Sequence, residues 1–528
     1  MALTKAHNRM IDGASISVKD FGATGDGITD DTTAIQAALA GGGTVYFPEG
    51  TYLTGSLAVY SDTEIIGAKN SIILATLITT SPLIRNAAYP NGNVNISIHD
   101  LTIDGGGPTA FNDTTIQLQN CTNTSVKDCH IYNYKNFAIS VLGAESSVVV
   151  ADNYVDGGVG GGPLGTGTAG GGINFSGGQN YMGNKCTGNT VINCAASGIV
   201  IQGGAKYIIV TGNTASYNGL TNGNGIYAGH ANTCVISNNI CRWNSWTPKS
   251  GSGIGINTSS YDCTNHTITG NICEYNGDDG IDVNAATNYK TSFHTITGNQ
   301  LNYNWGAGIN IAGYESKYNT ISANQIKGNG AAGIHLNADS GRNGFHTISD
   351  NIMLDNGQQA TGSPGIRCWD DNCTITGNVC SNTTGTMYQG GISVAGISGV
   401  VVGNTITNTT SPTFTFSNSN DHCIGFNSGS SMFKVGGDYK LNPAGATPDV
   451  TNVRTAKIYQ AGAINITDFV GGQTGKEIIL QFMDGHSTLI HSAALKLEGS
   501  VNVTMTGNNM ISLIHDGIGW VESSRSIR

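Results

Sequence analysis

Three carboxylates, those of Asp278, Asp279 and Asp282, fall within five residues in the stretch NGDDGIDVN, residues 276–284. Only 11% of the chain is Asp, Glu, Lys or Arg, so this clustering of like charge stands out. Neighbouring carboxyls split their pKa values, because ionising both at once costs energy, and one can then keep a proton while the other acts as a base. Cleavage of a glycosidic bond commonly uses such a pair. The competing interpretation is a solvated turn in which the aspartates only bond to nearby backbone.

A repeat positions this cluster. A Gly-Ile pair recurs at intervals of 25 to 32 residues, at Gly172, Gly198, Gly225, Gly253, Gly280, Gly308, Gly333, Gly365 and Gly391. The segments between the pairs are short, β-branched and broken by Gly and Asn, which favours strands and turns over helices. One repeat cannot bury its own apolar face, whereas stacked repeats can. The sequence therefore predicts an all-β fold, a parallel β-helix with like residues above like.

Three further columns follow from the same alignment. Asn residues of a TGN-type motif, Asn213 to Asn404, and a second Asn set, Asn218 to Asn408, are expected to form hydrogen-bonded ladders in the turns. Cys241, Cys273 and Cys380 fall in an inward-facing column, where a thiol serves as a small apolar group. A column of His and Cys (Cys234, His266, His294, His346, Cys373) is expected to be a polar stack. Its spacing does not match a zinc site, and no metal or cofactor is predicted.

The face that carries Asp282 becomes chemically distinctive over four successive coils. Aligned residues on this face are Asp282, Asn310, His335 and Arg367, and Trp369 follows in the next outward column. Trp305 and Trp246 precede the strands of neighbouring coils, so their rings are expected to flank the carboxylates and stack on sugar rings. We therefore predict Asp279 and Asp282 as the catalytic pair, with Asp278 beside them and Glu315 as a further candidate carboxylate. Arg367 is expected to bind an acidic sugar or to pair with Asp370 or Asp371.

Composition excludes several functional classes. The net charge of −11 argues against a nucleic-acid partner, and no apolar run is long enough for membrane insertion. The first residues lack the apolar segment of a signal peptide. The twelve Cys residues do not form compact pairs, so we expect them to be reduced and the protein to fold in a reducing cytoplasm. If the protein acts outside the cell, we expect release by lysis.

The two ends predict additional parts. Asp30 and Asp31 are good helix N-caps before the helical pattern DTTAIQAALA, so a short helix near 30–40 is expected to cap the solenoid. We predict an N-terminal arm at 1–15, a β-helix at 16–430, a linker at 431–450, and a small C-terminal β-domain at 451–528 for trimerisation or carbohydrate binding.

The segment VKDFGATGDGITDDTTAIQAAL, followed by GGGTVYFPEGTY, resembles the start of the pectate-lyase-like right-handed β-helix of bacteriophage tailspikes and tail depolymerases. The resemblance implies a homotrimer on the virion tail that binds or cleaves bacterial surface polysaccharide, such as capsule, O-antigen or exopolysaccharide. It also implies attachment to a phage tail or baseplate protein, for which residues 1–15 are available. The stretch GDDGIDV resembles part of the β-helix polygalacturonases, but that family's Gly-His-Gly motif is absent, so its mechanism does not transfer.

Three functional classes follow from these patterns. The first is a hydrolase that degrades polysaccharide, with a lyase as its nearest variant. A lyase would abstract a proton from a uronic acid and would use Ca²⁺ or an Arg to neutralise the sugar carboxylate. The second class is a glycan-binding fibre without catalysis, and the third is a structural appendage protein.

Overall fold

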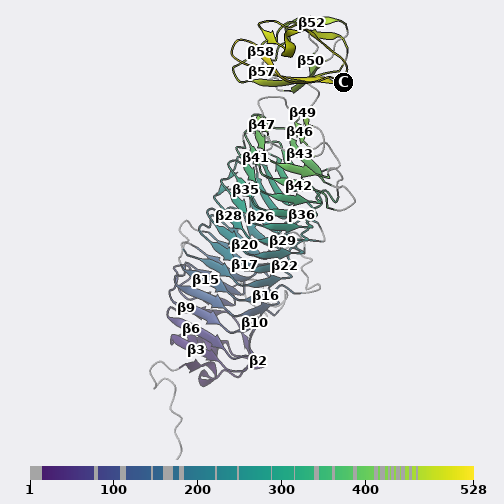
Figure 1. Cartoon of the computed structure of the whole chain (residues 1–528). Helices are drawn as coiled ribbons and strands as arrows, with labels where there is room; N and C mark the ends of the chain where they lie inside the picture. The colour runs from purple at the N-terminus through teal and green to yellow at the C-terminus, as the bar shows by residue number, and fades with distance from the viewer. Residues whose placement is uncertain are drawn as a thin grey trace, which may run out of the picture.

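The computed structural model describes residues 15–527 except 77–80, 107–113, 144–146, 159–169, 178–182, 221–222, 247–248, 287, 314, 338–343, 360–362, 384–388, 451–454, 459–461 and 484. Between 409 and 445 it describes only the backbone of five short strands. Three long parallel sheets wind through the chain as a solenoid, as Figure 1 shows. Each coil contributes one strand to each sheet, which confirms the predicted all-β, parallel β-helix fold.

The third sheet, called the site sheet below, carries the column with Asp282. Its strands are β5 (Leu57–Val59), β8 (Ile84–Asn86), β11 (Ile116–Gln119), β14 (Phe137–Leu142), β17 (Gly171–Ser176), β20 (Ile199–Gln202), β23 (Ile226–Ala228), β26 (Ile254–Thr258), β30 (Ile281–Ala285), β34 (Ile309–Gly313), β37 (Ile334–Asn337), β40 (Pro364–Cys368), β43 (Gly390–Val394), β46 (Phe414–Phe416) and β49 (Phe433–Val435).

The other two sheets complete each coil. The first contains β1 (Ile16–Ser17), β3 (Gly43–Phe47), β6 (Thr63–Gly67), β9 (Ile96–His99), β12 (Thr124–Lys127), β15 (Val148–Ala151), β18 (Lys185–Thr187), β21 (Ile209–Thr211), β24 (Val235–Ser237), β28 (Thr267–Thr269), β32 (Thr295–Thr297), β35 (Thr320–Ser322), β38 (Thr347–Ser349), β41 (Thr374–Thr376), β44 (Val400–Val402) and β47 (Cys423–Gly425). The second contains β2 (Asp26–Asp30), β4 (Gly50–Thr54), β7 (Ser71–Ala75), β10 (Thr102–Asp104), β13 (His130–Tyr132), β16 (Tyr154–Asp156), β19 (Thr190–Ile192), β22 (Thr214–Ser216), β25 (Ile240–Arg242), β29 (Ile272–Glu274), β33 (Gln300–Asn302), β36 (Gln325–Lys327), β39 (Ile352–Leu354), β42 (Val379–Ser381), β45 (Thr405–Thr407) and β48 (Ser428–Gly429).

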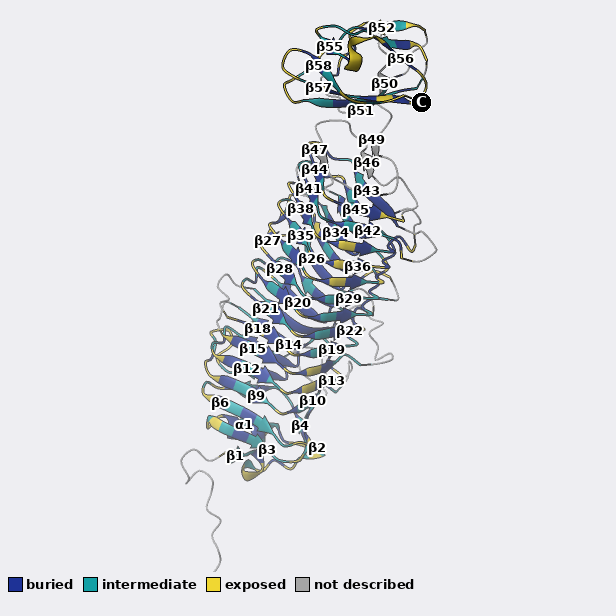
Figure 2. Cartoon of the chain, viewed as in Figure 1, coloured by how far each residue is buried: buried dark blue, intermediate teal, exposed yellow. Residues whose placement is uncertain are grey.

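One apolar core fills the solenoid, and along most strands buried residues alternate with more exposed ones (Figure 2). Strands β14, β17, β20 and β26 of the site sheet instead bury three or more successive residues. The predicted inward column is buried throughout, and Cys241, Cys273 and Cys380 are fully enclosed. No disulfide joins any of the eleven cysteines in the described ranges, all of which are buried. The thiols therefore pack as small apolar groups, as the alignment predicts.

Asn ladders stabilise the turns. The backbone N–H and the side-chain amide of Asn271 both donate to Asn299 Oδ1, at 2.9 and 3.0 Å, and Asn299 bonds in the same way to Asn324. The second ladder departs from the prediction at its upper end. Asn356 donates to Gln389 Oε1 at 2.7 Å, while Asn382 bonds to the backbone of Gln389 instead of taking the next place.

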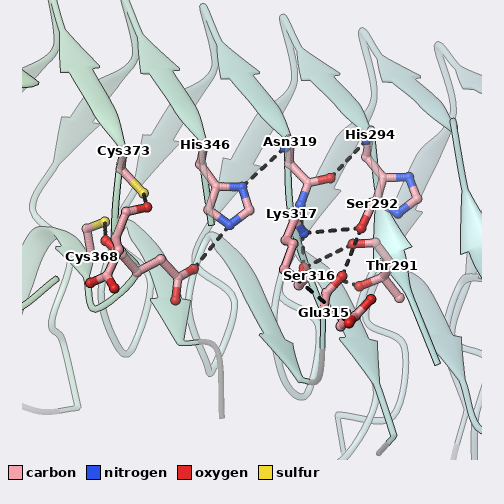
Figure 3. A network of polar contacts seen from close by, with 12 residues as sticks. Thr291, Ser292, His294, Glu315, Ser316, Lys317, Asn319, His346, Cys368 and Cys373 are labelled. Carbon is pink, nitrogen blue, oxygen red and sulfur yellow. Dashed lines mark hydrogen bonds and ion pairs between the residues drawn. The ribbon is translucent and has the colours of Figure 1, made fainter. Parts of the chain in front are cut away.

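The His and Cys column is also a ladder (Figure 3). The backbone N–H of Cys234 donates to His266 Nδ1 at 3.1 Å, and that of His266 donates to His294 Nδ1 at 3.2 Å. Asn319 donates in the same way to His346 Nδ1, whose Nε2 lies 3.1 Å from Asp370 Oδ2. The imidazole rings thus accept the backbone hydrogen bonds that side-chain amide oxygens accept in the Asn ladders. Among the residues that could be searched, no group of three or more His, Cys, Asp or Glu is placed to hold a metal ion.

The N-terminal end of the solenoid is covered by α1 (Thr32–Leu39), which follows a 3₁₀ turn at Val18–Phe21. Ile35, Ala38 and Leu39 of α1 are buried against the solenoid core. The Asp31 carboxylate accepts bonds from the N–H groups of Thr24 and Gly25 rather than capping the helix. No helix within the described ranges is long and apolar enough to cross a membrane.

The chain after the solenoid forms a separate core of its own. One sheet contains β50 (Lys440–Leu441), β51 (Thr455–Ile458), β53 (Glu477–Phe482), β57 (Asn509–His515), β58 (Trp520–Ser526) and β55 (Leu495–Lys496). A second contains β52 (Ile464–Ile466), β54 (Ser487–Leu489) and β56 (Val503–Met505), and a 3₁₀ turn spans Glu498–Ser500. β27 (Cys263–Thr264) and β31 (Thr291–Ser292) form a small additional pair in the solenoid.

Candidate functional site

The central column of the site lies on four hydrogen-bonded strands, β30, β34, β37 and β40. Their register places Asp282 beside Asn310, Asn310 beside His335, and His335 beside Arg367. The Asn310 amide donates to Asp282 Oδ1 at 3.0 Å. Strand spacing in a parallel sheet is about 4.8 Å, so the four side chains form one continuous stripe. The register is the one that the Gly-Ile alignment predicts.

The turn before β30 holds the other two acids against the turn of the next coil. The N–H of Ala307 donates to Asp279 Oδ1 at 2.5 Å, and the N–H of Gly306 donates to the carbonyl of Asp278 at 2.9 Å. A Cβ at Gly306 would lie 2.3 Å from Asp279 Oδ1 and 2.8 Å from Asp278 Oδ1. Only glycine at 306 therefore leaves room for both carboxylates.

Burial makes ionisation of this cluster costly. It raises the pKa of Asp279, which is 7% exposed, well above its usual range, and the charges of Asp282 and Asp278 raise it further. Burial also raises the pKa of Asp282, to about 6, although hydrogen bonding by Asn310 and Asn257 lowers it in part. The pKa of Asp278 is raised by burial as well. The pKa of Asp279 is thus raised more than that of Asp282, so Asp279 keeps its proton to a higher pH while Asp282 is mainly ionised at neutral pH, which is the division expected of an acid–base pair.

From the second strand above Asp282, β37, the stripe carries the basic residues His335 and Arg367, and Trp369 lies beside them. The ring of His335 meets that of Trp369 edge-on at 5.7 Å between centroids, and the Arg367 guanidinium lies 5.7 Å from the Trp369 ring centre. Burial lowers the pKa of His335 to about 4, and the Arg367 charge lowers it further, so this imidazole is neutral at neutral pH. Arg367 makes no ion pair within the described ranges.

That arrangement corrects the expected partner of Arg367. Asp370 lies 3.1 Å from His346 in the buried ladder. Asp371 accepts a bond from the N–H of Ile397 at 2.7 Å. Because neither aspartate pairs with Arg367, its guanidinium can bind an anionic group from outside.

Trp246 and Trp305 lie together, with perpendicular rings 6.5 Å apart. The ammonium of Lys249 sits over the face of Trp305 and lies 5.3 Å from the centre of the Trp246 ring. Lys249 also packs against the acidic turn, since a Cβ at Gly277 would lie 3.2 Å from its Cα. The tryptophans are therefore next to the aspartates, as predicted, but a cation covers one face of Trp305.

Glu315 is not brought to the acidic cluster. Its carboxylate lies 3.7 Å from Lys290 Nζ and 3.9 Å from Lys317 Nζ. Its carbonyl accepts a bond from Ser292, and Figure 3 shows Glu315 with Ser292 and Lys317. Glu315 thus belongs to a group of surface ion pairs with the two lysines. Glu274 likewise pairs with Arg242 at 3.0 Å.

Sequence reasoning missed three neighbours of the cluster: Lys249, Gly306 and Asn257. Lys249 follows a Trp that was identified, but its place over Trp305 depends on how two turns meet. Gly306 departs from no local pattern, since glycine is common in these turns. Asn257 is one of several Asn residues in its outward column, and only its proximity to Asp282 distinguishes it.

Known proteins agree with this architecture. Residues 15–227 match the family described as rhamnogalacturonase A/epimerase, pectate lyase-like, and residues 207–370 match the right-handed β-helix region. Over residues 15–370 the chain is thus similar to right-handed β-helix proteins of the pectate-lyase-like superfamily. The resemblance of its opening motif to this superfamily is thus confirmed.

Individual relatives of this β-helix protein match shorter segments. A pre-neck appendage protein of Bacillus phage B103 is 33% identical over 139 residues, which cover 25% of this chain and 16% of the phage protein. The mannuronan C5-epimerase AlgE2 of Azotobacter vinelandii is 40% identical over 107 residues, covering 17% of this chain and 11% of the epimerase. The chain thus spans less than a fifth of the length of these relatives.

Among solved structures, the tailspike protein of E. coli bacteriophage HK620 in complex with a pentasaccharide has a TM-score of 0.55 and 15% identity. The alignment covers 78% of each chain. At this identity the likeness establishes the shared fold.

Proposed function

We propose that this β-helix protein binds bacterial surface polysaccharide and hydrolyses it at the stripe formed by Asp282, Asn310, His335 and Arg367. The observation that carries the proposal is the buried acid pair, in which Asp279 bonds to the turn of the next coil, Asp282 bonds to Asn310, and the pKa of Asp279 is raised more than that of Asp282. The tailspike protein of similar fold is in complex with a pentasaccharide, which supports a glycan as the ligand.

The two carboxyls take different roles in this proposal. Asp279 donates its proton to the leaving oxygen, because its pKa is held high by burial and by the neighbouring charges. Asp282 activates the attacking water or attacks the sugar itself, because it is ionised at neutral pH and steadied by the Asn310 amide.

The flanking residues bind the sugar chain. Trp305, Trp246 and Trp369 supply aromatic surface for the apolar faces of sugar rings. Arg367 can form a paired hydrogen bond with a sugar carboxylate, since it has no ion partner within the described ranges.

A uronate lyase or epimerase is the second candidate. The observation that favours it is the neutral His335 next to Arg367, which makes no ion pair within the described ranges. His335 could remove a proton from a sugar carbon beside a carboxylate that the Arg367 guanidinium holds. The similarity to a mannuronan C5-epimerase supports this chemistry. A Ca²⁺ ion could assist a lyase, but none of the described residues is grouped to hold one.

One experiment separates these functions. The protein is incubated with purified capsular polysaccharide, lipopolysaccharide and polymannuronate, and the products are assayed for reducing ends, for ultraviolet absorbance of unsaturated uronates, and for deuterium uptake at C5. New reducing ends without absorbance indicate hydrolysis, absorbance indicates a lyase, and deuterium uptake without cleavage indicates an epimerase. Binding with none of these signals would leave a glycan-binding fibre and overturn the enzymatic proposal.

Variants then test the site itself. Asp279→Asn and Asp282→Asn are each expected to abolish cleavage and to retain binding, whereas Asp128→Asn, at an exposed turn, changes neither. Cleavage that continues unchanged in both site variants would refute the assignment.

We also propose that the protein works as a homotrimer on a phage virion. The similarity to phage appendage and tailspike proteins supports this placement, and residues 1–15 would serve as the attachment segment to a tail or baseplate protein. Light scattering of the purified chain tests the trimer directly, and a monomer at micromolar concentration would refute it.

A further inference from the structure

Within the described part of the chain, two buried polar atoms beside the acid pair lack a hydrogen-bond partner. They are Oδ1 of Asn257, on β26, and Nε2 of His335, on β37. A buried polar atom without a partner costs about 1–3 kcal/mol, and most such atoms in folded proteins are paired. These two atoms therefore call for an explanation at their particular place on the site sheet.

The solenoid satisfies similar side chains elsewhere. The amide of Asn271 donates to Asn299 and to the carbonyl of Ile236, and its Oδ1 accepts two bonds from Asn239. His294 also has an unpaired Nε2, but its Nδ1 accepts the ladder bond from His266. His335 makes no hydrogen bond within the described ranges.

The two unpaired atoms bracket the centre of the stripe. Asn257 lies on the strand next to Asp282, whose pKa its amide lowers. On the other side, His335 lies beside Asn310 in the register of β34 and β37. Three strand spacings separate β26 from β37, or about 14 Å, so a ligand that reaches both atoms must be longer than one sugar ring.

The atoms also define the chemistry of that ligand. The amide oxygen of Asn257 can only accept a hydrogen bond, whereas a neutral imidazole nitrogen accepts or donates according to its tautomer. A hydroxyl group serves both, and sugars present hydroxyls along their whole length. We propose that Asn257 and His335 are specificity-determining residues that bind sugar hydroxyls on either side of the Asp282–Asn310 pair. This inference rests on the proposed function and adds to it a residue and a length of bound chain.

The binding test uses protein carrying Asp282→Asn, so that no probe is cleaved. The probes are an oligomannuronate and a neutral O-antigen pentasaccharide, titrated by calorimetry. Asn257→Ala and His335→Phe are each expected to weaken binding of at least one probe by about 5- to 10-fold, the loss of one hydrogen bond. The matched control is Asn284→Ala, since exposed Asn284 lies beside Asn257 in the same outward column and makes no side-chain bond in the described structure. Unchanged affinity in both test variants would overturn the inference.

A second measurement decides the inference even without a bound probe. Because His335 makes no hydrogen bond within the described ranges, His335→Phe is expected to shift the melting temperature by only ~1 °C. The same substitution at a ladder position, His294→Phe, should lower it by several times more. Equal losses at the two positions would show that His335 is structural and would overturn the inference. Failure of both probes to bind, with melting temperatures as expected, would count against the proposed function alone.

Discussion

Replacing Asp282 by Asn is expected to stabilise the folded protein at neutral pH. Burial raises the pKa of this carboxyl from 3.8 to about 6, so the folded state holds its proton more tightly than the unfolded chain does. A shift of about two pKa units corresponds to about 3 kcal/mol of unfolding free energy. The carboxylate of Asp282 thus costs the folded protein stability wherever it is ionised.

The sign of the pH dependence follows from the raised pKa. Below the unfolded value near 3.8 both states are protonated and the cost is absent. The cost grows as the pH rises from about 4 to about 6 and stays constant above that. Asn keeps the shape and can still accept the hydrogen bond from Asn310, so Asp282→Asn should recover about 1–3 kcal/mol at ~pH 7.5 and nothing at ~pH 4.

Thermal unfolding followed by circular dichroism at one fixed scan rate measures this difference, since long solenoids often unfold irreversibly. Asp128→Asn is the matched control, because Asp128 is exposed and its backbone φ of 50° suits Asn equally well. A stabilisation of the same size at both pH values, or a loss of stability at ~pH 7.5, would refute the electrostatic reasoning.

Three other outcomes follow from the site and the ladders. If Asp282 is the base and Asp279 the acid, kcat/KM should rise with pH through about 6 and fall only at higher pH, and a rate independent of pH across this range would contradict the assignment. Burial lowers the pKa of His266 to about 4, so acidification below about 6.5 should destabilise the solenoid; His266→Asn, which can keep the ladder bond, should remove part of this acid sensitivity in the same melting assay. Lys249→Met should remove the positive charge over Trp305 while a side chain of similar length still covers the ring, so it should weaken binding of an anionic oligosaccharide severalfold more than that of a neutral one, as measured by calorimetry. Equal effects on both would show that Lys249 acts only through packing.

Much of the fold could be predicted because every coil of the β-helix requires the same types of residue at the same positions. A column of Asn or of buried aliphatic residues recurs at a fixed place, so the strand register follows from aligning one landmark. The prediction failed locally where one coil is longer, between Gly333 and Gly365, and just beyond it. There the ladder continues from Asn356 to Gln389, because the longer side chain reaches the place that Asn382 was expected to fill.

The site was predictable only in part. The stripe of Asp282, Asn310, His335 and Arg367 follows from register alone. The ion pairs that hold Glu315 between two lysines, and the ammonium over Trp305, depend on how separate turns meet in space. A sequence pattern also cannot reveal that Oδ1 of Asn257 and Nε2 of His335 lack a hydrogen-bond partner in the described structure, because that depends on which groups surround each atom in space.

The places where burial of polar and charged groups costs folding stability help to distinguish an active protein from a structural fibre. Most of the solenoid pairs its buried amides and keeps charge at the surface, so the scaffold has the means to avoid electrostatic strain. The coil at residues 276–284 instead buries acids whose pKa values are all raised, beneath a neutral His and an Arg that has no ion partner among the described residues. A fibre that only needed to be stable would gain from Asn or Ser at these positions, as neighbouring coils show. A stability cost confined to one face of successive coils is what a site for binding and chemistry requires.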